Sequence, residues 1–164
     1  MALEGLEVRP CQHCDGCLHT GICIIDDDMQ AIHRQLQGAD HIILAAPVFF
    51  MGLPAQAKAM IDRCQALWVE KYLLKRRHMF ARDGSRRRGL WLSVGGRKGP
   101  DLFGPSRATV RAFFATLDLE FWGELLYPQV DPYQAILSHP TTLAQAREAG
   151  ARLVTDPSPM FTPS

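Results

Sequence analysis

Residues 41–52 read His41-Ile42-Ile43-Leu44-Ala45-Ala46-Pro47-Val48-Phe49-Phe50-Met51-Gly52, and this stretch decides the fold. Its first half is continuously apolar after His41, which is typical of a parallel strand buried on both faces. We expect the strand to end at Pro47 and a loop to run to Gly52. A helix should follow from about Pro54 to Tyr72, since its apolar residues recur at spacings of three and four. The stretch therefore predicts a strand–loop–helix unit.

The alternation of strand and helix continues on both sides of this unit. The other expected elements are a helix at 29–37, a buried strand at 90–94, a glycine-rich loop at 95–100, a helix at 106–118, a strand at 120–127 and a helix at 142–154. Such alternation predicts an α/β fold with a parallel sheet. A chain of 164 residues suits one domain. We place this single domain at 1–155 and a loose tail at 156–164.

The sequence also predicts the local structure of three connecting segments. Residues 3–9 should form the end of a strand. One of the aspartates at 26–28 should cap the helix that begins at Met29, because Asp is a good N-cap, and the acidic run should otherwise be a solvated turn. The basic segment 75–88 should be a solvated connection, with contact to an anion or a nucleotide phosphate as the alternative.

The cysteines are crowded near the start of the chain, with the spacing C-x2-C-x2-C-x5-C over Cys11, Cys14, Cys17 and Cys23. So compact a quartet suits a [4Fe-4S] cluster, in which each iron takes one thiolate from a loop wrapped around the cube. That loop would be residues 10–24. Zinc usually takes cysteine or histidine pairs about a dozen residues apart and fits less well, and redox-active thiols without metal are the third alternative. Cys64 falls in the apolar stripe of a predicted helix and is expected in the core.

Composition narrows the classes of function. The chain is 47% apolar and 21% charged, and its formal net charge is +1, so bulk charge predicts neither nucleic-acid nor membrane binding. The N-terminal residues do not have the pattern of a signal peptide, and no apolar run approaches the roughly 18 residues of a membrane span. We expect a cytoplasmic protein that has no nucleic-acid or membrane partner.

Taken in order, these motifs resemble those of the iron–sulfur flavoproteins, a branch of the flavodoxin-like NAD(P)H-dependent FMN reductase superfamily. The resemblance rests on the cysteine motif, on Asp27-Asp28-Met29 and on the stretches at 46–52 and 56–63, and it covers about residues 8–130. It implies a flavodoxin-like three-layer sandwich with a parallel sheet, a [4Fe-4S] cluster on the four cysteines, and FMN at the carboxyl ends of the strands. The flavin-binding residues would be Pro47, Val48, Phe49, Phe50, Met51, Gly52, Ser93, Gly95 and Gly96.

The chemistry of the loops agrees with that placement. An aromatic, apolar loop with exposed backbone amides suits a flat isoalloxazine ring, and Gly95 and Gly96 allow close approach of the backbone. From the residues alone, Phe49 and Phe50 can equally be core side chains, and the glycines can simply turn the chain. No catalytic acid or base is predicted, because the cofactors carry the chemistry.

The chain departs from the family at its start. Family members begin with a strand and a Ser/Thr-rich, glycine-containing loop whose backbone amides hold the FMN phosphate. This chain starts near the end of the second strand, so it is N-terminally truncated relative to the family, and the edge of the strand at 41–46 should be open. Three explanations stay open: a start codon placed too far downstream, a strand supplied by another chain, or loss of ordinary FMN binding.

Two functions from different classes follow. The first is an FMN-dependent oxidoreductase that exchanges two electrons with NAD(P)H or a quinone-like molecule and passes single electrons to the cluster, with a ferredoxin-like protein as a further redox partner. The second is a flavin-free metal-binding or interaction module whose iron–sulfur or zinc site is structural. A thiol oxidoreductase using Cys11 and Cys14 is a weaker third, because this pair does not open a helix after a strand. A homo-oligomer is expected, as in families that resemble this one.

Overall fold

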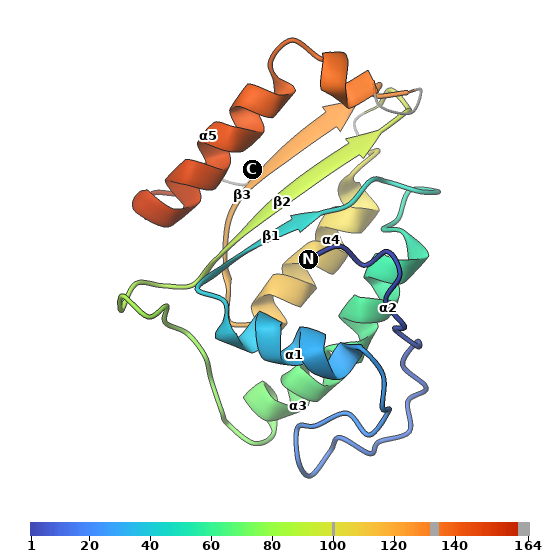
Figure 1. The fold of residues 1–164 in the computed structure, drawn as a ribbon, viewed down its shortest axis with the longest axis vertical. Helices are drawn as coiled ribbons and strands as arrows, with labels where there is room; N and C mark the ends of the chain where they lie inside the picture. The colour runs from blue at the N-terminus through green and yellow to red at the C-terminus, as the bar shows by residue number, and fades with distance from the viewer. Residues whose placement is uncertain (100, 132–134, 161–164) are drawn as a thin grey trace.

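A parallel three-stranded sheet forms the centre of the molecule (Figure 1). The computed structural model describes residues 1–99, 101–131 and 135–160. Along the chain its elements are α1 (Met29–Gly38), β1 (His41–Ala45), α2 (Ala55–Arg63), α3 (Gln65–Tyr72), β2 (Arg88–Gly95), α4 (Gly104–Thr116), β3 (Glu120–Pro128), the 3-10 helix η1 (Ala135–Ser138) and α5 (Thr142–Thr155). The sheet order is β1-β2-β3, and both neighbouring pairs are parallel. The predicted α/β class is confirmed.

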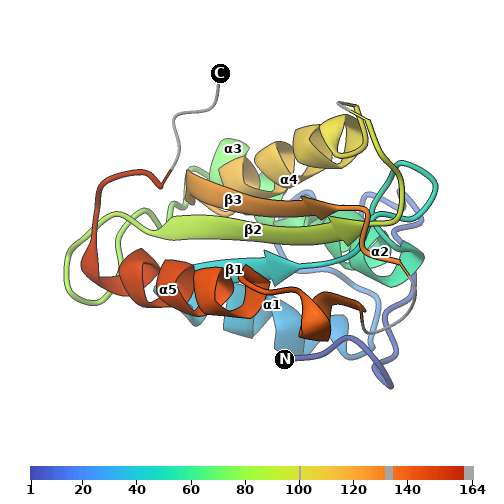
Figure 2. The same cartoon turned by 90° about the horizontal axis from the view of Figure 1, so that it is seen from above.

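Helices cover both faces of the sheet (Figure 2). Successive side chains of a strand point to opposite faces, so the fully buried Trp91 and Leu90 of β2 enter different cores. Trp91 packs with apolar residues of α1, α2 and α4, whereas Leu90 packs beneath α5. The result is three layers, with α1–α4 on one face of the sheet and α5 on the other.

The strand β1 is an edge strand in the described part of the chain, because it pairs with β2 alone. Its side chain Ile43 is 46% exposed. A cavity of about 780 Å³ lies beside it, lined by residues 1–6 and by parts of β1, α1 and α2. The open edge that the sequence analysis expected is therefore present.

Two secondary-structure predictions are wrong. Residues 3–9 form no strand, because the Glu7 amide donates to Asp28 Oδ2 at 2.8 Å and the Glu7 carbonyl accepts from the Asp28 amide at 3.1 Å. This backbone is thus paired with the start of α1. The helix predicted over 54–72 is two helices, α2 and α3, which meet at Cys64 where ψ is 4°, well outside the α-helical value. Cys64 itself is 2% exposed and belongs to the core, as predicted.

The end of the basic segment is buried, which corrects the prediction of a solvated connection. Arg87 and Arg88 are 2% and 3% exposed. Burial lowers the pKa of Arg87, and its guanidinium donates to the backbone carbonyls of Leu36, Ala39, His78 and Leu117. Carbonyls near helix ends need such donors, so Arg87 ties the ends of α1 and α4 to the start of β2.

The first residues of the predicted tail lie against the sheet. The Asp156 carbonyl accepts from Arg88 and from Trp122 Nε1, and the Met160 amide donates to the Trp122 carbonyl at 2.8 Å. Residues 161–164 of that tail lie outside the described residues. Within the described ranges, no helix combines the length and the apolar character that crossing a membrane requires.

Candidate functional site

A tight turn follows β1 at the carboxyl edge of the sheet. Phe49 and Gly52 exchange two backbone hydrogen bonds, each 2.9 Å long. The two residues between them, Phe50 and Met51, have φ angles of 48° and 66°, which is the geometry of a type I′ turn and usually calls for Asn or Gly. Holding two large side chains in the left-handed region costs energy, and such strain gathers at functional sites.

Two aromatic side chains of this turn face solvent. Phe49 is 60% exposed and Phe50 is fully exposed, so neither is the core residue that their apolar character also allowed. An apolar ring held in water by a strained turn gains nothing from folding of the chain itself. This arrangement is typical of a surface that binds a flat apolar ligand.

The turn is tied to the loop that follows β2. The Val48 amide donates to the Val94 carbonyl at 2.8 Å, and the buried Ser93 hydroxyl donates to the Ala46 carbonyl at 2.7 Å. Arg97 reaches the Met51 sulfur at 3.8 Å. The structure thus brings together the two predicted flavin-binding segments, 47–52 and 93–96, while the Ser93 side chain serves to join their strands.

Gly95 and Gly96 leave little room for a side chain. A Cβ at Gly95 would lie 3.0 Å from Leu102, and one at Gly96 would lie 3.3 Å from Asp131. Next to them an open apolar hollow of about 340 Å³ is lined by residues of β1, β2, β3 and α5, including Pro47 and Ser93. Its size lies within the range of small-ligand pockets. The exposed backbone of Gly96, the exposed aromatic rings and the apolar hollow together fit the ring system of a flavin, whereas Gly95 is buried under Leu102.

The four clustered cysteines line one pocket at the C-terminal end of α2, together with Arg63. All four are free; Cys11 and Cys14 are exposed, and Cys17 and Cys23 are half-buried. Partial burial raises the pKa of the Cys17 thiol, and the sulfurs of the other three cysteines raise it further. The other three sulfurs therefore lie near enough to Cys17 to disfavour its thiolate form.

The wrap of the cysteine loop depends on its glycines. A Cβ at Gly16 would lie 2.6 Å from the Ile24 side chain, and Gly21 has φ of 75° and packs on Glu70 of α3. Among the described residues, no three Cys, His, Asp or Glu side chains converge closely enough to hold a metal ion. The described loop is thus wider than a closed coordination site for one ion. Its four thiols are nevertheless the donors that a thiophilic metal group prefers.

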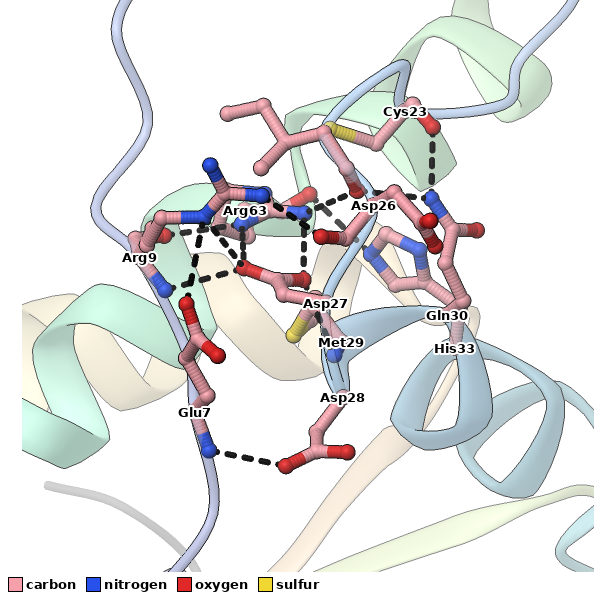
Figure 3. Close-up of polar contacts among 11 residues, drawn as sticks. Glu7, Arg9, Cys23, Asp26, Asp27, Asp28, Met29, Gln30, His33 and Arg63 are labelled. Atoms are coloured by element: carbon pink, nitrogen blue, oxygen red, sulfur yellow. Dashed lines mark hydrogen bonds and ion pairs between the residues drawn. The ribbon is translucent and has the colours of Figure 1, made fainter.

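The base of the cysteine loop is a buried ion pair that the sequence analysis missed (Figure 3). Arg63, the last residue of α2, donates to both Asp27 carboxylate oxygens, at 2.7 Å and 3.0 Å. Both side chains have no exposed surface. The acidic run at 26–28 is thus more than a solvated cap, although Asp27 also accepts from the Met29 amide at the start of α1.

Further hydrogen bonds join the two ends of the loop through the same pair. Before the cysteines, the Arg9 carbonyl accepts from Arg63 at 2.8 Å and the Arg9 amide donates to Asp27 at 3.0 Å. After them, the Ile25 carbonyl accepts from Arg63 at 3.2 Å, and Gln30 donates to the Cys23 and Ile25 carbonyls. Figure 3 shows Arg9 and Asp27 gathered around Arg63, with the Gln30–Cys23 contact to one side.

Burial and pairing have opposite effects on the two charges. Burial raises the pKa of Asp27, but hydrogen bonds from Arg63 and from the Arg9 and Met29 amides outweigh it, so the pKa is lowered. Burial lowers the pKa of Arg63, but the Asp27 carboxylate and the nearby Cys23 thiol outweigh it, so that pKa is raised. Both groups therefore stay ionised at neutral pH.

A signal for this pair is present in the sequence. Met60, Arg63, Cys64 and Leu67 follow the spacing of one helix face, so Arg63 occupies a position where an apolar residue is expected. A charge at such a position requires a buried partner. The partner, Asp27, is distant in sequence, and periodicity alone does not identify it.

Comparisons with known proteins agree with this geometry. Residues 2–98 match the model of the family described as NADPH-dependent FMN reductase. An iron–sulfur flavoprotein of Archaeoglobus fulgidus is 44% identical over 70 residues, which are 43% of this chain and 36% of the relative. One of Methanosarcina thermophila is 41% identical over 90 residues, 55% of this chain and 42% of the relative. The matched stretches thus span less than half the length of either relative.

Solved structures share the fold. The Trp repressor binding protein from Bacillus subtilis superposes with a TM-score of 0.56 at 23% identity, over 77% of this chain and 76% of that chain. An FMN-dependent NADH-azoreductase from Bacillus anthracis, solved in complex with FMN, gives a TM-score of 0.52 at 19% identity, over 76% of this chain and 61% of that one. The predicted flavodoxin-like fold and the resemblance drawn from the motifs are confirmed.

Proposed function

The chain belongs to the NADPH-dependent FMN reductase family, and on that premise we propose that it is an FMN-dependent oxidoreductase coupled to a [4Fe-4S] cluster. Its four clustered cysteines hold the cluster and its two carboxyl-edge loops hold the flavin ring. NAD(P)H supplies electrons, and a quinone-like molecule or a ferredoxin-like protein receives them. The protein acts as a homo-oligomer.

The observation that carries the cluster proposal is that four free thiols line one pocket. Four thiolates at this spacing are the ligand set that a [4Fe-4S] cluster takes. Metal binding by thiols requires their thiolate form, so a bound cluster would hold these four groups deprotonated.

When bound, FMN supplies the step between two-electron and one-electron chemistry. The residues of the chain position it. The aromatic side chains of Phe49 and Phe50 would give a stacking surface, and the exposed backbone at Gly96 would let the ring approach. In the described structure the amides of Phe50 and Met51 have no hydrogen-bond partner, so they are free to donate to the polar edge of the ring. Pro47 and the adjoining apolar hollow would give the ring an apolar surface to cover.

The test is an anaerobic purification with iron, sulfide and FMN quantified per chain. We expect about four irons and four sulfides per chain, together with stoichiometric FMN. The Cys11→Ser variant should lose iron, whereas Cys64→Ala is the matched control, because Cys64 is a core residue outside the cysteine pocket. Equal iron content in Cys11→Ser and the parent protein overturns the ligand assignment. Zinc in place of iron, or a cluster without flavin, supports the flavin-free module instead.

A further inference from the structure

Arg63 is a buried cation with one donor left over. Arg63 is 1% exposed. Its two terminal nitrogens donate to Asp27 and to the carbonyls of Arg9 and Ile25. The remaining N–H, at Nε, is buried and has no hydrogen-bond partner among the described residues. Buried donors in native proteins are nearly always paired, so this one calls for an acceptor.

The pocket of the four cysteines is where that acceptor would lie. Arg63 lines this pocket together with Cys11, Cys14, Cys17 and Cys23, and among the described lining residues it is the only lysine or arginine. Sulfur in a thiolate or a cluster accepts N–H hydrogen bonds, and a cluster on four thiolates carries net negative charge. Hydrogen bonds to the sulfurs and net charge are among the factors that set a cluster's reduction potential.

We propose that Arg63 is a positioning residue for the cysteine site, which closes the base of the loop through Asp27 and donates its remaining N–H to a sulfur of the bound cluster. The inference rests on the proposed function in taking the bound group to be a [4Fe-4S] cluster. Through Asp27 and Arg9 the guanidinium holds the residues before Cys11 next to those after Cys23. Its charge and its Nε donor then favour the reduced, more negative form of the cluster.

Two variants of the buried pair and one control test this proposal. Arg63→Lys keeps the positive charge but removes the two terminal guanidinium nitrogens and the Nε donor. Arg63→Met combined with Asp27→Leu removes both charges together, which avoids an unpaired buried ion and keeps the chain foldable. Arg107→Lys is the matched control, because Arg107 makes a similar two-pronged pair with Glu124 on α4 and β3, away from the cysteines.

The measurements are iron release to a chelator and the reduction potential of the cluster, followed anaerobically by EPR. In Arg63→Lys we expect iron release to be about 10- to 100-fold faster, the usual effect of losing an outer partner of a metal ligand. In the Met/Leu double variant the potential should fall, while Arg107→Lys should match the parent protein in both measurements.

The outcomes distinguish the inference from the proposed function. If the parent protein assembles a cluster and the double variant keeps the parent potential, Arg63 only supports the fold and the inference is wrong. If the parent protein and Arg107→Lys assemble no iron–sulfur cluster under the same reconstitution, the proposed function itself fails. A lowered potential in the double variant, with the circular dichroism of the parent protein, supports the proposal.

Discussion

The turn at 49–52 and the base of the cysteine loop hold their sites in opposite ways. The turn is exposed, apolar and strained, and short-range backbone hydrogen bonds fix it. The loop base is buried and charged, and side-chain contacts between residues far apart in sequence fix it. A site that stacks a flat ring needs bare surface, whereas a site that gathers anionic sulfurs needs rigid ends and a nearby cation.

The largest expected effect comes from breaking the buried pair. Asp27→Ala leaves Arg63 charged, buried and without its carboxylate, which should cost about 3–5 kcal/mol in the free energy of unfolding. Chemical denaturation of the parent and variant proteins measures it. Asp28→Ala is the control, because Asp28 is exposed and its carboxylate accepts from the Glu7 amide, and it should cost about 1 kcal/mol. Similar losses in both variants would mean that the pair does not close the loop.

A second prediction concerns overpacking of the sheet against α4. A Cβ at Gly89 would lie 2.6 Å from the ring of the buried Phe114, so Gly89→Ala should destabilise the protein by about 1–3 kcal/mol. At Gly16 the Cβ would meet the Ile24 side chain, which is 65% exposed and can rotate away. Gly16→Ala should therefore cost less. A larger loss at Gly16 would show that the cysteine loop is as tightly packed as the core.

A third prediction concerns the turn at 49–52, where one substitution should change FMN affinity without lowering stability. Phe50→Gly removes a fully exposed side chain from a residue with φ of 48°, so it should leave the free energy of unfolding unchanged or raise it by about 1 kcal/mol. FMN affinity should fall about tenfold, because a stacking face worth about 1 kcal/mol is lost. Flavin fluorescence titration measures the affinity. Phe80→Ala is the control, since Phe80 is also 60% exposed and lies in the segment before β2.

Acid should remove the contribution of Asp27. Its pKa is lowered in the folded protein, so its stabilising effect is complete above the ordinary value of 3.8 and disappears as pH falls through the folded value. The unfolding free energies of the parent protein and Asp27→Asn should thus converge below a pH of about 3.8. A constant difference down to strongly acidic pH would contradict the pairing.

The smallest effect is expected on the surface. The Arg82 guanidinium holds the pKa of the exposed Asp40 at about 2. Arg82→Ala should return this pKa toward its ordinary value and leave stability nearly unchanged, because exposed ion pairs contribute little. NMR titration of the Asp40 carboxyl measures the shift. A large loss of stability would mean that this surface pair resembles the buried one.

The difference between the two regions also explains what the sequence could predict. The strands and the two carboxyl-edge loops depend on neighbouring residues, so the apolar run at 41–46 and the glycines at 95–96 located them correctly. The Asp27–Arg63 pair and the bonds from Arg87 to Leu36, Ala39 and Leu117 join residues 30 or more positions apart, and propensity cannot supply such partners. The turn geometry at Phe50 was also missed, because neither residue of its left-handed pair is Gly or Asn.

The central claim is that two separate regions of one chain hold two different redox groups. The most direct measurement is the iron and FMN content of three anaerobically prepared proteins: the parent chain, Cys17→Ser and Phe50→Gly. We predict that Cys17→Ser loses iron and keeps flavin, and that Phe50→Gly binds FMN more weakly and keeps iron. Loss of both groups in either variant, or of neither group in both, would contradict two separate sites.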